Sequence, residues 1–287
     1  MALPWPISGI GVLNAIAIGV GVEVTRTIRF ADGKRGLLDV YAPKGAVNAP
    51  LVVFFYGGGW ESGERADYRF AAMALAKRGF VVVVPDYRVY PEVRFPDFLT
   101  DGAKAVRWAQ RNADEFGADP GLILLIGHSA GAYIAAMLAL DRRWLDGKSQ
   151  AALAGVVGLA GPYDFLPLHS EVLEAIFAPA GDLKLSQPIA YARGDAVPML
   201  LLSGLSDKTV RPENSRRLGA RIRMLGGDAR AKFYERVDHA TILGAFSPLL
   251  RPLAPVFADT VAFVEARVHE LRSNPGSPRF YRTNQLP

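Results

Sequence analysis

Short apolar runs alternate with amphipathic segments along most of this chain. A run of β-branched, leucine or aromatic residues bounded by Gly, Pro or Asp is typical of a strand buried on both faces. Apolar residues that recur every three or four positions indicate a helix with one face on the core. Strands are therefore predicted at residues 51–56, 80–84, 122–126, 155–160, 198–203 and 232–237. Helices are predicted at residues 67–78, 97–116, 130–140, 213–225 and 254–271.

The beginning of the chain has a different pattern. Residues 24–30 alternate in strand fashion, Asp32-Gly33 favours a turn, and residues 37–41 resume the strand, which predicts an antiparallel pair. The later strands alternate with helices, so the predicted fold class is α/β, a mostly parallel, doubly wound sheet. Ligands of such sheets bind at the carboxyl ends of the strands. The residues just past strand ends, which should share one rim, are Gly57, Ser129, Pro162, Ser206 and Asp238.

One large domain with short additions accounts for the length. Of the 287 residues, 50% are hydrophobic, enough for one sizeable core, which we assign to residues 23–272. Residues 165–195 separate two core strands by more than an ordinary connection needs, so we expect a small cap there. Residues 273–287, rich in Pro, Ser and Asn, are the predicted C-terminal tail.

An apolar arm, residues 1–22, precedes the domain. Its uncharged part, residues 7–22, is shorter than the roughly 20 residues that a membrane-spanning helix needs. It also lacks the preceding Lys or Arg of a signal peptide. We expect the arm to pack on the body of the domain, and a membrane-surface or homodimer contact is the alternative.

Composition excludes several classes of chemistry. The chain has no Cys, which excludes disulfides, a Cys nucleophile and thiolate metal ligands. Its four His residues show no metal-binding spacing, so we expect no catalytic metal and no cofactor. The formal net charge is +5, but the basic residues are scattered among acidic and apolar ones, so we expect no nucleic-acid partner. The composition does not decide the compartment, and a cytoplasmic location is slightly favoured.

A G-x-S-x-G sequence at residues 127–131 is the most informative chemical feature. It follows a predicted strand and precedes a predicted helix, which is the context of a nucleophile elbow. A strand that reverses directly into a helix crowds the neighbouring positions, so Gly127 and Gly131 must lack side chains. Ser129 is therefore the predicted nucleophile.

A serine nucleophile needs a base, usually His, and a carboxylate that orients the base. His239 follows the last predicted strand in a short loop and is our candidate base. His169 in the cap is the weaker alternative, and His269 is expected on the surface of the last helix. Asp207, just past a buried strand, is the candidate acid, and Asp238 is its rival because it adjoins His239.

When a serine attacks a carbonyl group, the carbonyl oxygen becomes negatively charged. Backbone N–H groups are needed to donate hydrogen bonds to this oxyanion. One donor is expected to be the amide of Ala130, directly after the nucleophile. Gly57-Gly58-Gly59 follows a predicted strand and leaves amides free to approach a ligand, so Gly58 and Gly59 are the other candidates. A phosphate cradle is not indicated, because Gly-x-Gly-x-x-Gly is absent and no Lys-Ser/Thr follows.

These segments together resemble the α/β-hydrolases of the carboxylesterase and hormone-sensitive-lipase-like group, over residues 23–271. The small esterase and arylformamidase-like branch is similar in its Leu38-Asp39-Val40-Tyr41 strand and short cap. The resemblance implies an α/β-hydrolase fold and a serine carboxylic-ester hydrolase whose partner is a small-molecule ester. The segments that carry it are Tyr56-Gly57-Gly58-Gly59-Trp60, Pro85-Asp86-Tyr87-Arg88, the elbow, Ser203-Gly204-Leu205-Ser206-Asp207 and Asp238-His239.

The resemblance also implies something about the substrate. The group usually has a loop-bracing His where Tyr56 stands, and we expect the longer phenol to keep the loop geometry and to reach the pocket. Trp60 and Tyr163 are expected to line an apolar pocket with the cap, suited to short to medium acyl or aryl esters. An arylformamidase-type amidase with the same triad is the alternative function. A non-catalytic ligand-binding protein is disfavoured because no triad member is missing.

Overall fold

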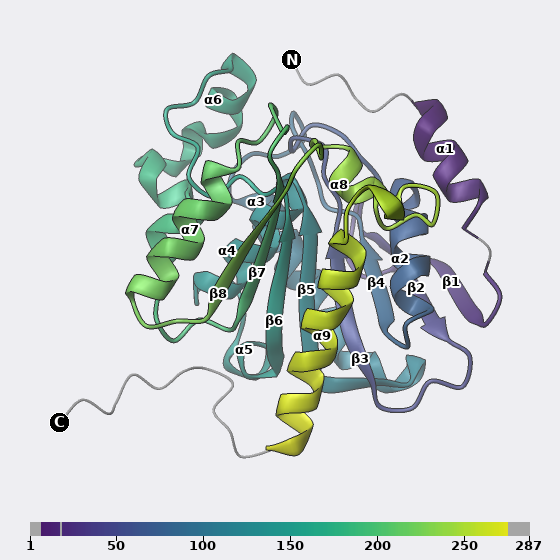
Figure 1. Ribbon diagram of the computed structural model, residues 1–287. Helices are drawn as coiled ribbons and strands as arrows, with labels where there is room; N and C mark the ends of the chain where they lie inside the picture. The colour runs from purple at the N-terminus through teal and green to yellow at the C-terminus, as the bar shows by residue number, and fades with distance from the viewer. Residues whose placement is uncertain (1–6, 18, 275–287) are drawn as a thin grey trace.

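The structure is a computed structural model that describes residues 7–17 and 19–274. Within these residues the strands form one eight-stranded sheet in the order β1-β2-β4-β3-β5-β6-β7-β8 (Figure 1). The strands are β1 (Val22–Arg29), β2 (Leu37–Pro43), β3 (Ala49–Phe55), β4 (Val81–Pro85), β5 (Ala118–His128), β6 (Leu153–Leu159), β7 (Met199–Gly204) and β8 (Ala229–Tyr234). The α-helices are α1 (Ile7–Ala15), α2 (Arg69–Ala76), α3 (Asp97–Arg111), α4 (Ala130–Leu140), α5 (Gly147–Ala152), α6 (Glu171–Phe177), α7 (Glu213–Met224), α8 (Thr241–Gly244) and α9 (Val256–Ser273). Most of the predicted tail lies outside the described residues.

The sheet is antiparallel only at its first edge. β1 pairs with β2, and β2 with β4, in antiparallel fashion, whereas the other pairs are parallel. This confirms the predicted α/β class with an antiparallel pair at the start of the chain. β3 and β6 are buried at every residue, as their continuous apolar runs predict.

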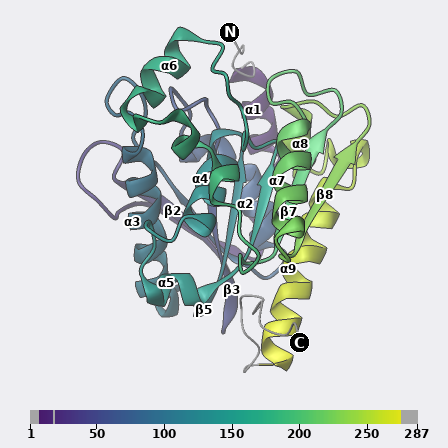
Figure 2. The same ribbon diagram turned by 90° about the vertical axis from the view of Figure 1, so that its left-hand side faces the viewer.

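Helices cover both faces of the sheet. Figure 1 shows α2 and α9 in front of the strands and α3 and α4 behind them, and Figure 2 shows the same layers from the side. α4 packs on β5 and β6 and is buried at every residue, which explains why its sequence is apolar all round. The doubly wound arrangement is therefore confirmed.

Boundaries differ from the prediction where local turns interrupt a helix. The predicted helix 97–116 divides into α3 and a 3-10 turn, Ala113–Phe116, closed by Gly117 with a φ of +70°. A left-handed Gly ends a helix by turning its last carbonyls. The predicted helix 67–78 begins as a 3-10 turn, Arg65–Tyr68, before α2. The sequence pattern does not predict α5, α6 and α8, because none is long enough to show a helical period.

The segment predicted to form a cap leaves the sheet between β6 and β7. It contains α6 and three 3-10 turns, and α6 lies at the same end of the sheet as α8 (Figure 1). Ile176 and Phe177 of α6 are fully buried. The Ile176 carbonyl accepts a hydrogen bond from the Phe95 amide at 2.9 Å, so the cap is joined to the loop before α3.

The apolar arm packs on the body through α1 and the residues that follow it. Leu13 and Ala17 are buried, whereas Val12 and Ile16 are exposed. The Asn14 side chain accepts a hydrogen bond from the amide of the second residue of α2 at 2.9 Å, which satisfies one of the donors that a helix start leaves unpaired. Among the described residues, no helix is both long and apolar enough to cross a bilayer.

The elbow between β5 and α4 depends on two glycines. Ser129 has a φ of 54° and a ψ of −123°, a conformation that residues with side chains rarely adopt. A Cβ on Gly127 would lie 2.3 Å from the Gly131 carbonyl oxygen, and one on Gly131 would lie 2.1 Å from the Phe55 carbonyl oxygen. Backbone atoms cannot move aside cheaply, so both positions require Gly, as the motif predicts.

We expect Gly131→Ala to destabilise the fold by about 3 kcal/mol, because the added methyl group collides with the β3 backbone. Gly147→Ala is the matched control, since a Cβ at the start of α5 meets nothing within 4 Å. Its free energy of unfolding should stay within about 0.5 kcal/mol of the parent value. Urea titrations of the three proteins measure both effects, and equal stability of the two variants would contradict the collision.

Candidate active site

Three loops bring the predicted nucleophile, base and acid together. Ser129 follows β5, Asp207 follows β7 and His239 follows β8, so all three lie at carboxyl ends of strands. The His239 Nε2 lies 2.9 Å from the Ser129 Oγ, and the His239 Nδ1 lies 2.8 Å from the Asp207 Oδ2. One continuous series of hydrogen bonds therefore links the three side chains.

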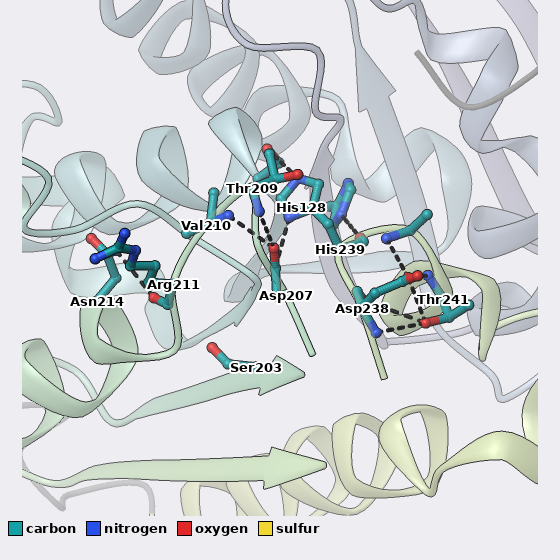
Figure 3. Close-up of polar contacts among 12 residues, drawn as sticks. His128, Ser203, Asp207, Thr209, Val210, Arg211, Asn214, Asp238, His239 and Thr241 are labelled. Carbon is teal, nitrogen blue, oxygen red and sulfur yellow. Dashed lines mark hydrogen bonds and ion pairs between the residues drawn. The ribbon is translucent and has the colours of Figure 1, made fainter. Parts of the chain in front are cut away.

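The Asp207 carboxylate is held through both of its oxygens. Oδ1 accepts hydrogen bonds from the amides of Thr209 and Val210, each at 2.9 Å, and Oδ2 faces the His239 ring (Figure 3). An ionised carboxylate only accepts, so His239 Nδ1 carries the proton and donates it. Nε2 is then bare and accepts from the Ser129 hydroxyl. The buried carboxylate thereby selects the tautomer that can act as a base.

The alternative acid and bases point elsewhere. The Asp238 Oδ1 accepts from the Ala240 and Thr241 amides at 3.1 and 2.8 Å, so it stabilises the turn into α8 (Figure 3). Burial acts to raise the pKa of Asp238, but these hydrogen bonds outweigh it and the pKa lies below its usual value. His169 on the cap and His269 on α9 are both exposed. The geometry therefore favours Asp207 and His239.

Backbone amides beside Ser129 are available to a ligand. Those of Gly58, Gly59 and Ala130 donate no hydrogen bond within the described part of the chain. Gly58 and Gly59 have φ values of +136° and +63°, which side chains disfavour. A Cβ added to Gly57 would lie 3.0 Å from the Ser129 Cβ, so the glycine loop passes directly beside the predicted nucleophile. These amides are the kind of donor that an oxyanion needs.

Tyr56 lies inside the glycine loop and not in a pocket. Its side chain is fully buried and stacks on Tyr87, with ring centroids 4.6 Å apart. Its hydroxyl accepts hydrogen bonds from Arg35 Nη1 at 2.9 Å and from the Tyr87 amide at 3.3 Å. The expectation that the phenol reaches the pocket is therefore wrong, because Arg35, from the connection between β1 and β2, binds the hydroxyl in the interior. The expectation that Tyr56 keeps the loop in place agrees with these bonds.

Trp60 packs against residues of the cap, whereas Tyr163 packs against the sheet. The Trp60 ring stacks on Phe165 with centroids 5.9 Å apart and meets Tyr133 and Phe177 edge to face at 5.2 and 5.0 Å. Trp60 thus joins the glycine loop to the cap, and its predicted place in the wall of a pocket stays a prediction. Tyr163 is fully buried and its hydroxyl packs closely on the backbone of β6, so its ring belongs to the core and does not line a pocket.

A partly buried ion cluster at the turn before α2 is absent from the sequence prediction. The Arg65 Nε donates to the Asp39 Oδ1 at 2.9 Å, and the same guanidinium pairs with Asp86. The Arg65 amide also donates to the Asp86 Oδ1 at 2.9 Å, which ties the turn before α2 to the end of β4. Asp39 stands among the apolar residues of β2 and Asp86 directly follows those of β4, and a buried carboxylate in such a place signals a cationic partner.

His128, the variable residue inside the elbow motif, is the other feature that the sequence does not reveal. Its ring is buried, with Nε2 2.9 Å from the His239 carbonyl oxygen and Nδ1 2.9 Å from the Tyr68 hydroxyl. Burial, together with the nearby His239, lowers the pKa of His128 to about 3. The ring is therefore neutral at ordinary pH.

Residues 38–222 match the sequence profile of the BD-FAE family, more than half of the chain. The chain belongs to the BD-FAE family. The BD-FAE family is a family of α/β-hydrolases, so the match confirms the resemblance, and the matched residues include the glycine loop, the elbow and residues 203–207.

Curated relatives of this BD-FAE family member are named as esterases. An isoprenylcysteine alpha-carbonyl methylesterase of Arabidopsis thaliana is 28% identical over 268 residues, which cover 85% of this chain and 62% of the relative. Esterase LipC of Mycobacterium tuberculosis is 30% identical over 220 residues, which cover 69% of this chain and 55% of the relative. The chain therefore spans less than two thirds of the length of either relative.

Solved structures share the fold of the BD-FAE family member. A truncated carbohydrate esterase from gut microbiota has a TM-score of 0.75 at 21% identity, covering 86% of this chain and 96% of that chain. A thermophilic esterase of Thermogutta terrifontis, Est2 with propionate bound, has a TM-score of 0.66 at 26% identity, covering 88% of this chain and 94% of that chain. The predicted α/β-hydrolase fold is confirmed.

The buried, neutral His128 predicts a particular dependence of stability on pH. Its pKa is about 3 in the folded state, against about 6.5 in the unfolded chain. Between these two values the imidazole is protonated in the unfolded chain but neutral in the folded protein. The free energy of unfolding therefore decreases as the pH falls through this range. We expect His128 to lower the free energy of unfolding by about 1.4 kcal/mol for each pH unit by which the pH falls within this range.

Urea titrations from about pH 7 to about pH 4 measure this slope. In His128→Gln, whose amide does not ionise, the free energy of unfolding should decline less steeply than in the parent. His269→Gln, at an exposed His, is the control and should keep the parental slope. A parental slope in His128→Gln would contradict a buried, neutral ring.

Proposed function

We propose that this BD-FAE family member is a serine carboxylic-ester hydrolase that acts through an acyl-enzyme. The observation that carries the proposal is the hydrogen-bonded series from Asp207 through His239 to Ser129, with separations of 2.8 and 2.9 Å. It lies beside amides that donate no hydrogen bond within the described residues. Ligand binding alone requires neither the selected imidazole tautomer nor the strained nucleophile.

In the first half-reaction, the Ser129 oxygen attacks the ester carbonyl carbon while His239 Nε2 takes the hydroxyl proton. The Asp207 carboxylate stabilises the imidazolium that forms. The carbonyl oxygen becomes an oxyanion, which the amides of Gly58, Gly59 and Ala130 bind. His239 then gives its proton to the departing alcohol, and an ester between Ser129 and the acyl group remains.

In the second half-reaction, water takes the place of the alcohol. His239 accepts a proton from the water, whose oxygen attacks the acyl carbon, and the same amides bind the second oxyanion. When the bond to Ser129 breaks, His239 returns the proton to the serine oxygen and the carboxylic acid leaves. Each transferred proton passes through His239, so the scheme requires no further ionisable group.

The acyl pocket in this proposal is small and apolar. The rings around Trp60 leave it only 4% exposed, so the wall between the glycine loop and the cap is closely packed and suits short to medium acyl or aryl groups. The solved Est2 structure with bound propionate supports a short acyl group. The names of the relatives range from a methylesterase of isoprenylcysteine to a general esterase, so they support ester cleavage without selecting one substrate.

Ser129→Ala should reduce turnover of a short nitrophenyl ester by about 10⁴-fold or more, because the nucleophile is removed. The purified variant should also lose labelling by a fluorophosphonate probe. Ser149→Ala, which changes a buried serine of α5 outside the site, is the control and should retain both. A parental rate in Ser129→Ala would overturn the proposal.

We expect ester turnover to decline once the acyl chain exceeds about ten carbons, because the aromatic wall limits the pocket. Phe165→Ala should move the optimum toward longer chains by removing the ring that stacks on Trp60. Leu185→Ala, at an exposed residue of the cap, should leave the optimum unchanged. Rates across a series of nitrophenyl esters measure these optima, and rates that keep rising with chain length in the parent would contradict a small pocket.

A further inference from the structure

A second series of hydrogen bonds runs beside the three side chains of the proposed mechanism. The Gly57 amide donates to the Tyr68 hydroxyl at 2.8 Å, and this hydroxyl lies 2.9 Å from His128 Nδ1. The other ring nitrogen, Nε2, lies 2.9 Å from the His239 carbonyl oxygen. The series therefore joins the glycine loop at one end to the backbone of the base at the other. Neither Tyr68 nor His128 takes part in the proposed mechanism.

Only one assignment of donors and acceptors gives every group in the series a hydrogen-bond partner. The His239 carbonyl can only accept, so His128 Nε2 must carry the proton. A neutral imidazole has a single N–H, which leaves Nδ1 as an acceptor for the Tyr68 hydroxyl. The Tyr68 oxygen then accepts from the Gly57 amide. The tautomer of His128 is thus the opposite of that of His239, whose proton lies on Nδ1.

Both side chains of the series are buried and neutral. Burial raises the pKa of Tyr68 and lowers that of His128, so neither changes its charge in the pH range in which enzymes work. The ring centroids of His128 and His239 lie 4.9 Å apart. A Cβ on Gly57 would lie 3.0 Å from His128 Nδ1 and 3.1 Å from the Tyr68 hydroxyl, so the loop and the series are in direct contact.

We propose that Tyr68 and His128 are positioning residues that set the oxyanion-binding amides and the imidazole of His239 at a fixed separation. The inference rests on the proposed function. Gly57 leads into two glycines whose backbones no Cβ restricts, and His239 stands in the loop between β8 and α8. Oxyanion binding and proton transfer must occur together, and a misplacement of about 1 Å costs on the order of a hundredfold in rate. A series anchored on the backbone of both loops prevents such a shift.

Two substitutions separate the two hydrogen bonds of the His128 ring. The amide nitrogen of Gln can take the place of Nε2 and donate to the His239 carbonyl, but it offers no acceptor at the position of Nδ1. The amide oxygen of Asn can take the place of Nδ1 and accept from Tyr68, but it leaves the His239 carbonyl without a donor. Tyr68→Phe removes the hydroxyl that serves both Gly57 and His128.

Steady-state kinetics with a short nitrophenyl ester test the inference. Tyr68→Phe, His128→Gln and His128→Asn should each lower kcat by about tenfold to a hundredfold, while KM changes by less than about twofold. The inhibition constant of a trifluoromethyl ketone, which forms an oxyanion on Ser129, should rise by the factor by which kcat/KM falls.

Tyr234→Phe is the matched control. It also loses a tyrosine hydrogen bond, which the hydroxyl donates to Asp259 of α9 at 2.6 Å, and it should keep the parental constants. Because Tyr68→Phe and His128→Gln break the same series, the double variant should be little slower than either single variant. Effects that multiply in the double variant, or a parental kcat in the folded single variants, would overturn the positioning role.

Nitrogen NMR of the His128 ring separates this inference from the proposed function. From about pH 5 to about pH 8 the ring should show a protonated Nε2 and a bare Nδ1, and Tyr68→Phe should shift the Nδ1 resonance. A protonated Nδ1 overturns the series, whether or not the protein cleaves esters. If Ser129→Ala is inactive while Tyr68→Phe keeps the parental kcat, the positioning role alone is overturned. If the spectra are as expected but Ser129→Ala still cleaves esters, the proposed function is overturned, and the positioning role with it.

Discussion

The close approach of backbone to backbone at the elbow is the constraint on which the site depends. β5 reverses into α4 at Ser129, and the Ser129 amide donates to the Leu159 carbonyl of the neighbouring strand at 2.9 Å. The strained backbone at such a residue costs about 1–3 kcal/mol. α4 is buried at every residue, so the apolar area that it removes from water offsets this cost. The fold thus holds a conformation that the local sequence alone would not adopt.

The elbow presents a hydroxyl, but a buried carboxylate determines how the neighbouring imidazole is protonated. Asp207 can only accept hydrogen bonds, and the amides of Thr209 and Val210 occupy one of its oxygens. The other oxygen receives the Nδ1 proton of His239, so the ring presents a bare Nε2 to Ser129. A group that can only accept also fixes the tautomer of His128, because its Nε2 faces the His239 carbonyl oxygen and must carry the proton. This tautomer is the opposite of that of His239. Two adjacent imidazoles therefore have different protonation patterns for one physical reason.

The glycine loop is held from the far edge of the sheet. Arg35, from the connection between the two antiparallel strands, donates to the Tyr56 hydroxyl and to the Gly63 carbonyl, each at 2.9 Å. Arg65 links Asp39 of β2 to Asp86 just past β4. Both guanidinium groups are partly buried, and the two aspartates that pair with Arg65 are buried, so each of these polar groups has a partner inside the protein. The antiparallel edge is thus part of the support of the site.

The sequence by itself determined those features that depend on residues close together along the chain. The apolar runs predict the parallel strands, and the bounds 130–140 of the helix after the elbow agree with α4 because Ser129 and its glycines mark its start. The gathering of Ser129, Asp207 and His239 at one edge also follows from the sequence, because each stands after the end of a parallel strand, β5, β7 and β8. Each of these features depends on residues within one element or on the common edge of parallel strands.

Only the tertiary structure decided which side chains meet across the fold. The Tyr56 hydroxyl faces Arg35 instead of a pocket, and the Tyr68 hydroxyl faces His128. In each pair the partners are far apart in sequence, and each hydroxyl could have bonded to many other donors or acceptors. A hydrogen bond depends on distances of a few tenths of an ångström, whereas hydrophobic periodicity fixes only the face on which a residue lies. That difference in required precision is why the sequence predicts the fold and the nucleophile but not the network that positions them.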